Sequence, residues 1–250
     1  MNVTLLAHTP NPERLVATAA RLCYSADDVA TIMDEMCDHE AEKQIKLLHS
    51  IGHESPIEHV SFTFAIEGVS RSLLAQITRH RLASFSVRSQ RYVSMSYGDY
   101  VMPDAIADDD FLGEKFDKAM REARKVYRGI ANVLMAKYKS EGMDAKSAEK
   151  KAIEDARFVL PNAACTSMVM TMNARELLHF FRLRTCNRAQ WEIREAADKM
   201  LAECYRVAPT IFKDAGCGCC SGACPEGRMS CGKSRKAEID IIKEGAINNG

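Results

Sequence analysis

The most constraining feature of this chain is a long apolar repeat between Asp110 and about Lys139. Apolar side chains recur there every three or four residues, at Phe111, Leu112, Phe116, Met120, Ala123, Tyr127, Ile130, Leu134 and Tyr138. This spacing places them on one face of an α-helix, which turns once in about 3.6 residues. The segment therefore predicts one long helix whose apolar face must be covered by other parts of the fold.

Shorter patterns predict strands and helices on both sides of this segment. Alternation of apolar side chains indicates strands at 1–6, 60–66 and 166–172. Capping and breaking residues mark three helices: one starting at Asn11-Pro12, one over 41–51 ending at Gly52, and one capped by Ser70. Further helices are predicted at 147–158, 174–184 and 189–207. The order indicates an α+β fold with long helices packed on an antiparallel or mixed sheet.

Composition excludes several classes of protein. The 250 residues are 46% apolar, and 34 Lys and Arg balance 34 Asp and Glu. A neutral chain argues against wholesale binding to nucleic acid or to an anionic membrane, although it allows a local basic pocket. No signal-peptide pattern and no apolar run long enough to span a membrane occurs in the sequence. We therefore expect a cytoplasmic protein with reduced cysteines, no membrane contact and no nucleic-acid partner.

The composition changes abruptly after Lys213. Glycines alternate there with five cysteines, Cys217, Cys219, Cys220, Cys224 and Cys231. The sequence thus predicts one domain over 1–213 and a Cys/Gly-rich tail over 214–250. The thiols are numerous enough for zinc or an iron–sulfur cluster, but their spacing fits no standard finger and no histidine is near. A flexible or redox-prone tail is the alternative, and no metal is assigned.

The strongest chemical signal is the segment Arg79 to Tyr92, which reads RHRLASFSVRSQRY. It holds four arginines, one histidine and three serines. A guanidinium offers paired donors that match phosphate or carboxylate and stays charged, so the cluster suits a dianionic ligand. A solvated basic face is the simpler interpretation. The position of the cluster at a helix-to-loop junction, after two apolar elements, favours a binding site.

A second set of polar residues follows downstream. Arg157 precedes Pro161 at the end of a predicted helix, and Asn173-Ala174-Arg175 opens another helix that ends at Arg184. A helix start offers free backbone N–H groups to anions, and Asn173 is suited to cap this one. Taken singly, each arginine is better explained by a surface ion pair.

Taken in order, these residues resemble the flavin-dependent thymidylate synthases. Arg79-His80-Arg81, then seven residues, then Ser89 matches that family's signature. The resemblance extends upstream to 52–59 and downstream through 157–161, 173–175, 183–184 and 189–194, so it covers about residues 1–213 in the right order. The tail lies outside it.

The resemblance implies the fold of that family and a methyltransferase reaction. Members make thymidylate by reductive methylation of deoxyuridylate, with methylenetetrahydrofolate as carbon donor and NADPH-reduced FAD as hydride source. Arg184 is implied as the catalytic residue that polarises the uracil ring. Carried over by motif, the deoxyuridylate site comprises Gln76, Ile77, Thr78, Arg79, Val87, Arg88, Ser89, Gln90, Arg91, Arg157 and Arg184.

The same resemblance implies a flavin site and a shared assembly. FAD is expected at Ser55, Arg79, His80, Arg81, Asn173, Ala174, Arg175 and His179, with His53 near the flavin ring and the folate. Two positions depart from the family pattern. Many members have a carboxylate at the position of Val87 and a histidine at the position of Arg188, so the contacts of those family side chains are not transferred. Members are homotetramers with active sites built from several subunits, which is expected here too.

Two other functions compete with this one. A nucleic-acid-binding module with a zinc-ribbon tail would use the arginine segment on phosphates, but it predicts a basic chain and leaves 173–184 unexplained. A flavoprotein acting on another nucleotide is the third interpretation.

Overall fold

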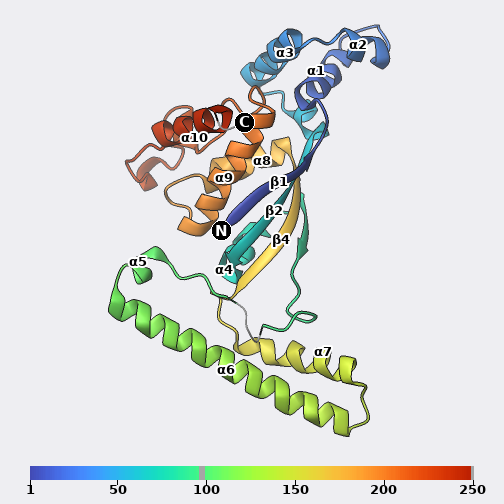
Figure 1. The fold of residues 1–250 in the computed structure, drawn as a ribbon. Helices are drawn as coiled ribbons and strands as arrows, with labels where there is room; N and C mark the ends of the chain where they lie inside the picture. Colours follow the sequence, from blue (N-terminus) through green and yellow to red (C-terminus); the bar gives the residue numbers. More distant parts are fainter. Residues whose placement is uncertain (96–98, 249–250) are drawn as a thin grey trace. The chain divides into compact units, whose positions relative to one another are not determined.

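The computed structural model describes residues 1–95 and 99–248, which form two compact units (Figure 1). The first unit comprises residues 1–66, 76–85 and 169–250, and the second comprises 67–75 and 86–168. The tail predicted at 214–250 belongs to the first unit, and its last two residues lie outside the described ranges. The domain boundary at residue 213 stays a prediction.

Four strands form one sheet. They are β1 (Asn2–His8), β2 (Ser61–Ser70), β3 (Ala83–Val87) and β4 (Cys165–Asn173), hydrogen-bonded in the order β1-β2-β4-β3. Strands β2, β3 and β4 each have residues in both units. The α+β class and the three predicted strands are confirmed.

The helices of the first unit begin and end where the sequence supplies the signals. They are α1 (Pro12–Leu22), α2 (Val29–Glu35), α3 (Asp38–Ile51), α8 (Ala174–Arg184), α9 (Trp191–Val207) and α10 (Lys236–Asn248), with short 3₁₀ turns η1 (Ser55–His59), η3 (Gly218–Cys220) and η4 (Gly227–Met229). Pro12 opens α1. Gly52 ends α3 at φ 68°, a left-handed conformation that suits glycine.

Aromatic side chains form the centre of the first unit. The ring centroids of Phe62 on β2 and Phe212 lie 5.4 Å apart, and those of Phe212 and Phe181 lie 6.0 Å apart. Phe180 packs against Phe181 at 5.8 Å. All four side chains are fully buried. They fix α8 against the sheet, which matters because α8 carries much of the candidate site.

The second unit is dominated by a pair of helices. It contains most of α4 (Arg71–Ile77), then α5 (Asp104–Ala107), α6 (Asp110–Ser140), α7 (Ala145–Ala156) and the turn η2 (Arg157–Val159). Helices α6 and α7 pack side by side (Figure 1). Asp109 and Asp144 cap them through hydrogen bonds to backbone N–H groups. The long helix predicted at 110–139 is confirmed.

Two apolar clusters cover the inner face of α6. Tyr127 and Ala131 pack with Met95, Ile153 and Ala156, while Tyr138 packs with Ala148 and Ala152. The backbone N–H of Met95 donates to the Tyr127 hydroxyl at 3.2 Å, so the buried phenol has a partner.

The structure adds elements that the sequence analysis did not predict. Strand β3 lies inside the arginine-rich segment treated above as a loop, although its residues ASFSV alternate in exposure as a strand requires. Helices α2 and α5 were also not predicted, and neither was α10, which lies in the tail that the sequence marks only as rich in cysteine and glycine. Among the described residues, no helix is both long and apolar enough to cross a membrane.

Candidate active site

Three polar side chains form a hydrogen-bonded chain in the first unit. Two of them, Glu176 and Arg184, belong to α8, and His80 lies between them. The N-cap of α8, Asn173, accepts a hydrogen bond at Oδ1 from the backbone N–H of Glu176, at 2.8 Å, as predicted for this residue. The Glu176 carboxylate lies 3.3 Å from Nδ1 of His80. Nε of Arg184, at the end of the same helix, donates to Nε2 of His80 at 3.1 Å.

This geometry fixes the proton on His80. An arginine Nε can only donate, so Nε2 of His80 must accept, and Nδ1 must carry the proton that faces Glu176. Burial lowers the pKa of His80, as do the charge of Arg184 and His179, whereas Glu176 raises it. The side chains of His80 and Glu176 are only 5% and 10% exposed. The imidazole is therefore a neutral support for the Arg184 guanidinium.

Positive charge accumulates around this support. Burial, and then the charge of Arg79, lower the pKa of Arg184, which nevertheless stays protonated. Arg79 and Arg81 are exposed, and neither forms an ion pair with any other residue that the structure describes. Uncompensated guanidinium groups at one place suit an anionic ligand.

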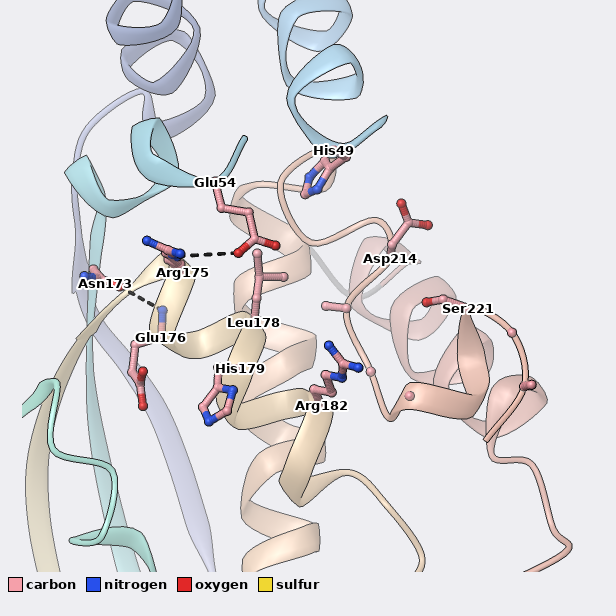
Figure 2. Close-up of a pocket in the computed structure, with 15 residues that line it drawn as sticks. His49, Glu54, Asn173, Arg175, Glu176, Leu178, His179, Arg182, Asp214 and Ser221 are labelled. Carbon is pink, nitrogen blue, oxygen red and sulfur yellow. Dashed lines mark hydrogen bonds and ion pairs between the residues drawn. The ribbon is translucent and has the colours of Figure 1, made fainter. Parts of the chain in front are cut away.

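A cavity of about 810 Å³ opens beside the start of α8. Figure 2 shows side chains from three parts of the first unit around it, among them His49 of α3, Arg182 of α8 and Ser221 of the tail. Nε2 of His49 is buried and has no hydrogen-bond partner among the described residues. The remaining lining includes Glu54, Asn173, Arg175, Glu176, Leu178, His179, Asp214, Gly216 and Gly218.

Arg175 lies on this wall, where two carboxylates hold it. Its guanidinium pairs with Glu54, at 3.4 Å, and with Glu58. Both carboxylates belong to the segment around η1, so the pairs tie the start of α8 to that turn. Ser55 and His53 are exposed in the same segment and do not line the cavity.

The structure limits what two of the predicted site residues can contribute. The side chains of Ile77 and Ala174 are fully buried in the apolar core. The backbone N–H of Ala174 donates to the Val60 carbonyl at 2.8 Å, and the Ile77 carbonyl accepts from the backbone N–H of His80 at 3.1 Å. Neither side chain is exposed to a ligand. A contact through their remaining backbone atoms stays a prediction, as do the roles of Gln76 and Thr78.

The second unit holds the remaining predicted substrate residues, Val87, Arg88, Ser89, Gln90, Arg91 and Arg157. The Ser89 hydroxyl accepts from the backbone N–H of Arg91 at 3.2 Å. Arg91 pairs with Glu154 at 2.9 Å. The backbone N–H of Arg88 donates to the Ser167 carbonyl at 2.9 Å, which anchors the end of β3 beside β4.

The second unit also contains a basic residue that the sequence analysis missed. Burial lowers the pKa of Arg71, the first residue of α4, and the charge of Arg157 lowers it further. Two like charges that interact in a half-buried place are a candidate site for an anion. The signal in the sequence is weak, because Arg71 lies outside the dense arginine segment.

Arg188, which departs from the resemblance, has a structural partner in the tail. Its guanidinium donates to Glu226 at 2.7 Å and to the Met229 carbonyl at 3.0 Å. This side chain therefore holds the loop around η4, and the tail has a fixed place in the first unit.

The cysteines of the tail do not form the predicted candidate metal site. Sγ of Cys217 lies 3.3 Å from that of Cys219 and 3.4 Å from that of Cys220, but Cys224 and Cys231 are not part of this contact. Within residues 1–95 and 99–248, no group of three or more His, Cys, Asp or Glu side chains is arranged to hold a metal ion. The zinc-ribbon hypothesis thus finds no support.

Two comparisons with known proteins identify the family to which this chain belongs. Residues 4–210 match the family model described as "Thymidylate synthase complementing protein". The flavin-dependent thymidylate synthase of Clostridium tetani is 54% identical over 234 residues, which cover 94% of each chain. The chain belongs to the flavin-dependent thymidylate synthase family.

Other relatives of the same name are more distant. The protein of Geobacter sulfurreducens is 45% identical over 95% of this chain and 97% of its own length. That of Pyrococcus furiosus is 38% identical over 90% of both chains. The resemblance drawn from the sequence is confirmed. The Clostridium match also includes part of the tail, because residues 1–213 alone cannot supply 94% of 250 residues.

Proposed function

We propose that this protein makes thymidylate from deoxyuridylate by reductive methylation. Methylenetetrahydrofolate is the carbon donor, and FAD reduced by NADPH supplies the hydride. The observation that carries the proposal is the Glu176–His80–Arg184 chain, because it holds one guanidinium in a fixed direction near the positive charge of Arg79. Such a preorganised cation stabilises negative charge that develops on a substrate without any protein nucleophile.

The cavity beside α8 supports a flavin nucleotide as the cofactor. Its volume of about 810 Å³ lies within the range of pockets that take large organic ligands. Asn173, Arg175, His179 and His49 are among the residues that line it. These residues would hold one part of FAD there, and the exposed Arg79, Arg81 and Ser55, which do not line the cavity, would bind another part of the cofactor. His53 would lie near the flavin ring and the folate.

The deoxyuridylate phosphate would be bound by residues of the second unit. The charge of Arg157 lowers the pKa of the half-buried Arg71, so a phosphate dianion bound beside both would relieve their repulsion. Ser89 and Gln90 would donate hydrogen bonds, and Arg88 and Arg91 would add positive charge. Arg184 would polarise the uracil ring by stabilising charge as N3 ionises.

Quaternary structure is part of the proposal. Helix α6 exposes Phe111, Leu112, Val126 and Val133, with Phe111 63% and Val133 69% exposed. Apolar side chains in such positions fit an interface between subunits. A homotetramer in the cytoplasm, with sites shared among subunits, is the assembly we propose. The alternative of a nucleic-acid-binding module is not favoured.

A reconstituted assay tests the function directly. The purified protein is given deoxyuridylate, methylenetetrahydrofolate and NADPH, with and without added FAD, and thymidylate is measured. We expect thymidylate only when flavin is present, either bound at purification or added. As a matched control, Arg206→Lys changes an arginine that pairs with Glu203 on the surface. Flavin-loaded protein that forms no thymidylate would refute the proposal.

A further inference from the structure

Three cysteine side chains meet in the tail at distances typical of contact between thiols. Cys217 Sγ lies 3.3 Å from Cys219 Sγ and 3.4 Å from Cys220 Sγ, around the turn η3. All three are free thiols. A disulfide requires sulfur atoms about 2.0 Å apart. Only side-chain rotation and a local shift of the loop separate these thiols from a covalent bond.

The two closest thiols have different surroundings. Cys217 is only 1% exposed, and its burial raises the pKa of its thiol. Partial burial opposes ionisation of Cys219, but hydrogen bonds from the Arg235 backbone N–H, Cys217 and Ser234 lower its pKa overall. Cys219 also lines a cavity of about 230 Å³, together with Arg188 and Lys233. Cys219 is therefore the thiol that a small reagent can reach and that ionises more readily.

We propose that Cys217 and Cys219 are a reversible redox site, oxidised to an intrachain disulfide by a low-molecular-weight disulfide that enters this cavity. The Cys219 thiolate attacks one sulfur of the small disulfide, forms a mixed disulfide and releases one small thiolate. Cys217 then loses its proton and attacks Cys219 Sγ, which displaces the second small thiolate. Both cysteine sulfurs are oxidised, the small disulfide gains two electrons, and the released protons convert its halves to thiols.

Cys220 is the less suitable partner for Cys217. Burial raises the pKa of its thiol, and Cys220 is not among the residues that line the cavity of about 230 Å³. Within the described ranges, no three His, Cys, Asp or Glu side chains are arranged to bind a metal ion, so a metal site at these cysteines is not supported. Cys231 Sγ instead donates to the Lys233 carbonyl at 3.3 Å.

A disulfide between Cys217 and Cys219 would displace part of the wall of the cavity beside α8. Gly216 and Gly218, which flank Cys217, line that cavity. Gly218 has no free space, because a Cβ atom there would lie 2.6 Å from Pro225 Cγ. Any shift that joins the two thiols must therefore move this wall. We expect weaker FAD retention in the oxidised protein, and this consequence alone rests on the proposed function.

The experiment uses the full-length protein and oxidised glutathione as the probe. After oxidation, free thiols are alkylated, and cleavage at lysine and arginine releases residues 214–228 as one peptide with Cys217, Cys219, Cys220 and Cys224. The wild type should show two alkylated cysteines in this peptide instead of four, and dithiothreitol should restore all four. Cys220→Ser should still form the bond, and Cys219→Ser should not.

The cysteine variants show which two thiols form the disulfide. Cys217→Ser should trap glutathione on Cys219 as a mixed disulfide. If this variant of a buried residue misfolds, the peptides of the wild type and of Cys219→Ser still show whether Cys219 forms the disulfide. The proposal is overturned if all four thiols are alkylated after oxidation, or if the bond persists in Cys219→Ser. Stoichiometric zinc that is lost in Cys219→Ser would also overturn it. Because the mass readout needs no flavin, a disulfide in a protein that never binds FAD would refute only the proposed function.

Discussion

Glu176 and Arg184 stand two turns apart on α8 and contact opposite nitrogens of one imidazole, that of His80. The carboxylate fixes the tautomer, and the tautomer makes Nε2 an acceptor for the guanidinium. The same Glu176 lines the large cavity and has its backbone N–H capped by Asn173. The cavity and Arg184 are thus joined through a single buried carboxylate.

Arg184→Lys should lower turnover much more than it weakens FAD binding. A lysine has no Nε–H fork to engage His80, so its ammonium is not held in one direction. Loss of one positioned donor typically costs about 10²- to 10³-fold in kcat. Single-turnover methylation by the flavin-reduced variant measures this step, and flavin fluorescence measures binding. Methylation at the parent rate would show that Arg184 does not have this role.

Glu176→Gln should change the pH dependence as well as the rate. The amide oxygen of this variant can still accept the Nδ1 proton, but the carboxylate charge, which raises the pKa of His80, is gone. We expect kcat to fall roughly tenfold and the acid limb of the kcat profile to move to lower pH. If Glu176 had only a structural role, its replacement would lower kcat by the same factor at every pH and would leave the pH of the acid limb unchanged. Glu195→Gln, on the surface pair with Lys199, is the control.

His80 should also make stability depend on pH. Burial, Arg184 and His179 lower its folded pKa below the unfolded value of 6.5, against the opposing effect of Glu176. The unfolded chain then binds the proton more readily, so stability is highest above pH 6.5 and falls as pH drops from there toward the folded pKa. Urea unfolding at several pH values should show a weaker dependence in His80→Gln. His59→Gln, at an exposed position, should keep it.

The sequence predicted the elements with clear local signals. The apolar repeat of α6, Gly52 at the end of α3 and Asn173 at the start of α8 act within a few residues, so their patterns are visible in the chain. Helix α10 was missed because only Ile239 and Lys243 are buried in it. Its position depends on contacts with α9 that no local pattern reveals.

The sequence predicted which residues belong to the site but not how they are arranged in space. The arginine segment and the resemblance supplied His80 and Arg184, but the two are 104 residues apart in sequence and only the fold brings them into contact. Glu176 gives no signal in the sequence, because an acidic residue in the first turn of a helix is common. Arg71 was missed for a similar reason, since its importance comes from the charge of Arg157, which is distant in sequence.

Arg71→Gln should weaken substrate binding without destabilising the free protein. Arg71 and Arg157 repel each other in a half-buried place, so removing one charge relieves strain in the absence of a ligand. We expect the KM for deoxyuridylate to rise about tenfold or more, because a charged hydrogen bond to phosphate is lost. The melting temperature without ligand should stay constant or rise. An unchanged KM would exclude Arg71 from the phosphate site.

Arg235→Ala should destabilise the tail and the first unit together. Arg235 is 6% exposed, pairs with Asp198 at 3.0 Å and with Glu238 at 2.5 Å, and donates to the Thr185 carbonyl at 2.6 Å. Its removal leaves the partly buried Asp198 without its hydrogen-bonded partner and, among the described residues, with only the charge of Arg194 to stabilise it, and burial already raises the pKa of that carboxylate. Breaking a buried pair on one side costs about 3–5 kcal/mol. Urea unfolding measures the change, with the exposed Lys236→Ala as the control. Double replacement Arg235→Leu with Asp198→Leu should recover part of the loss, because no unpaired charge remains.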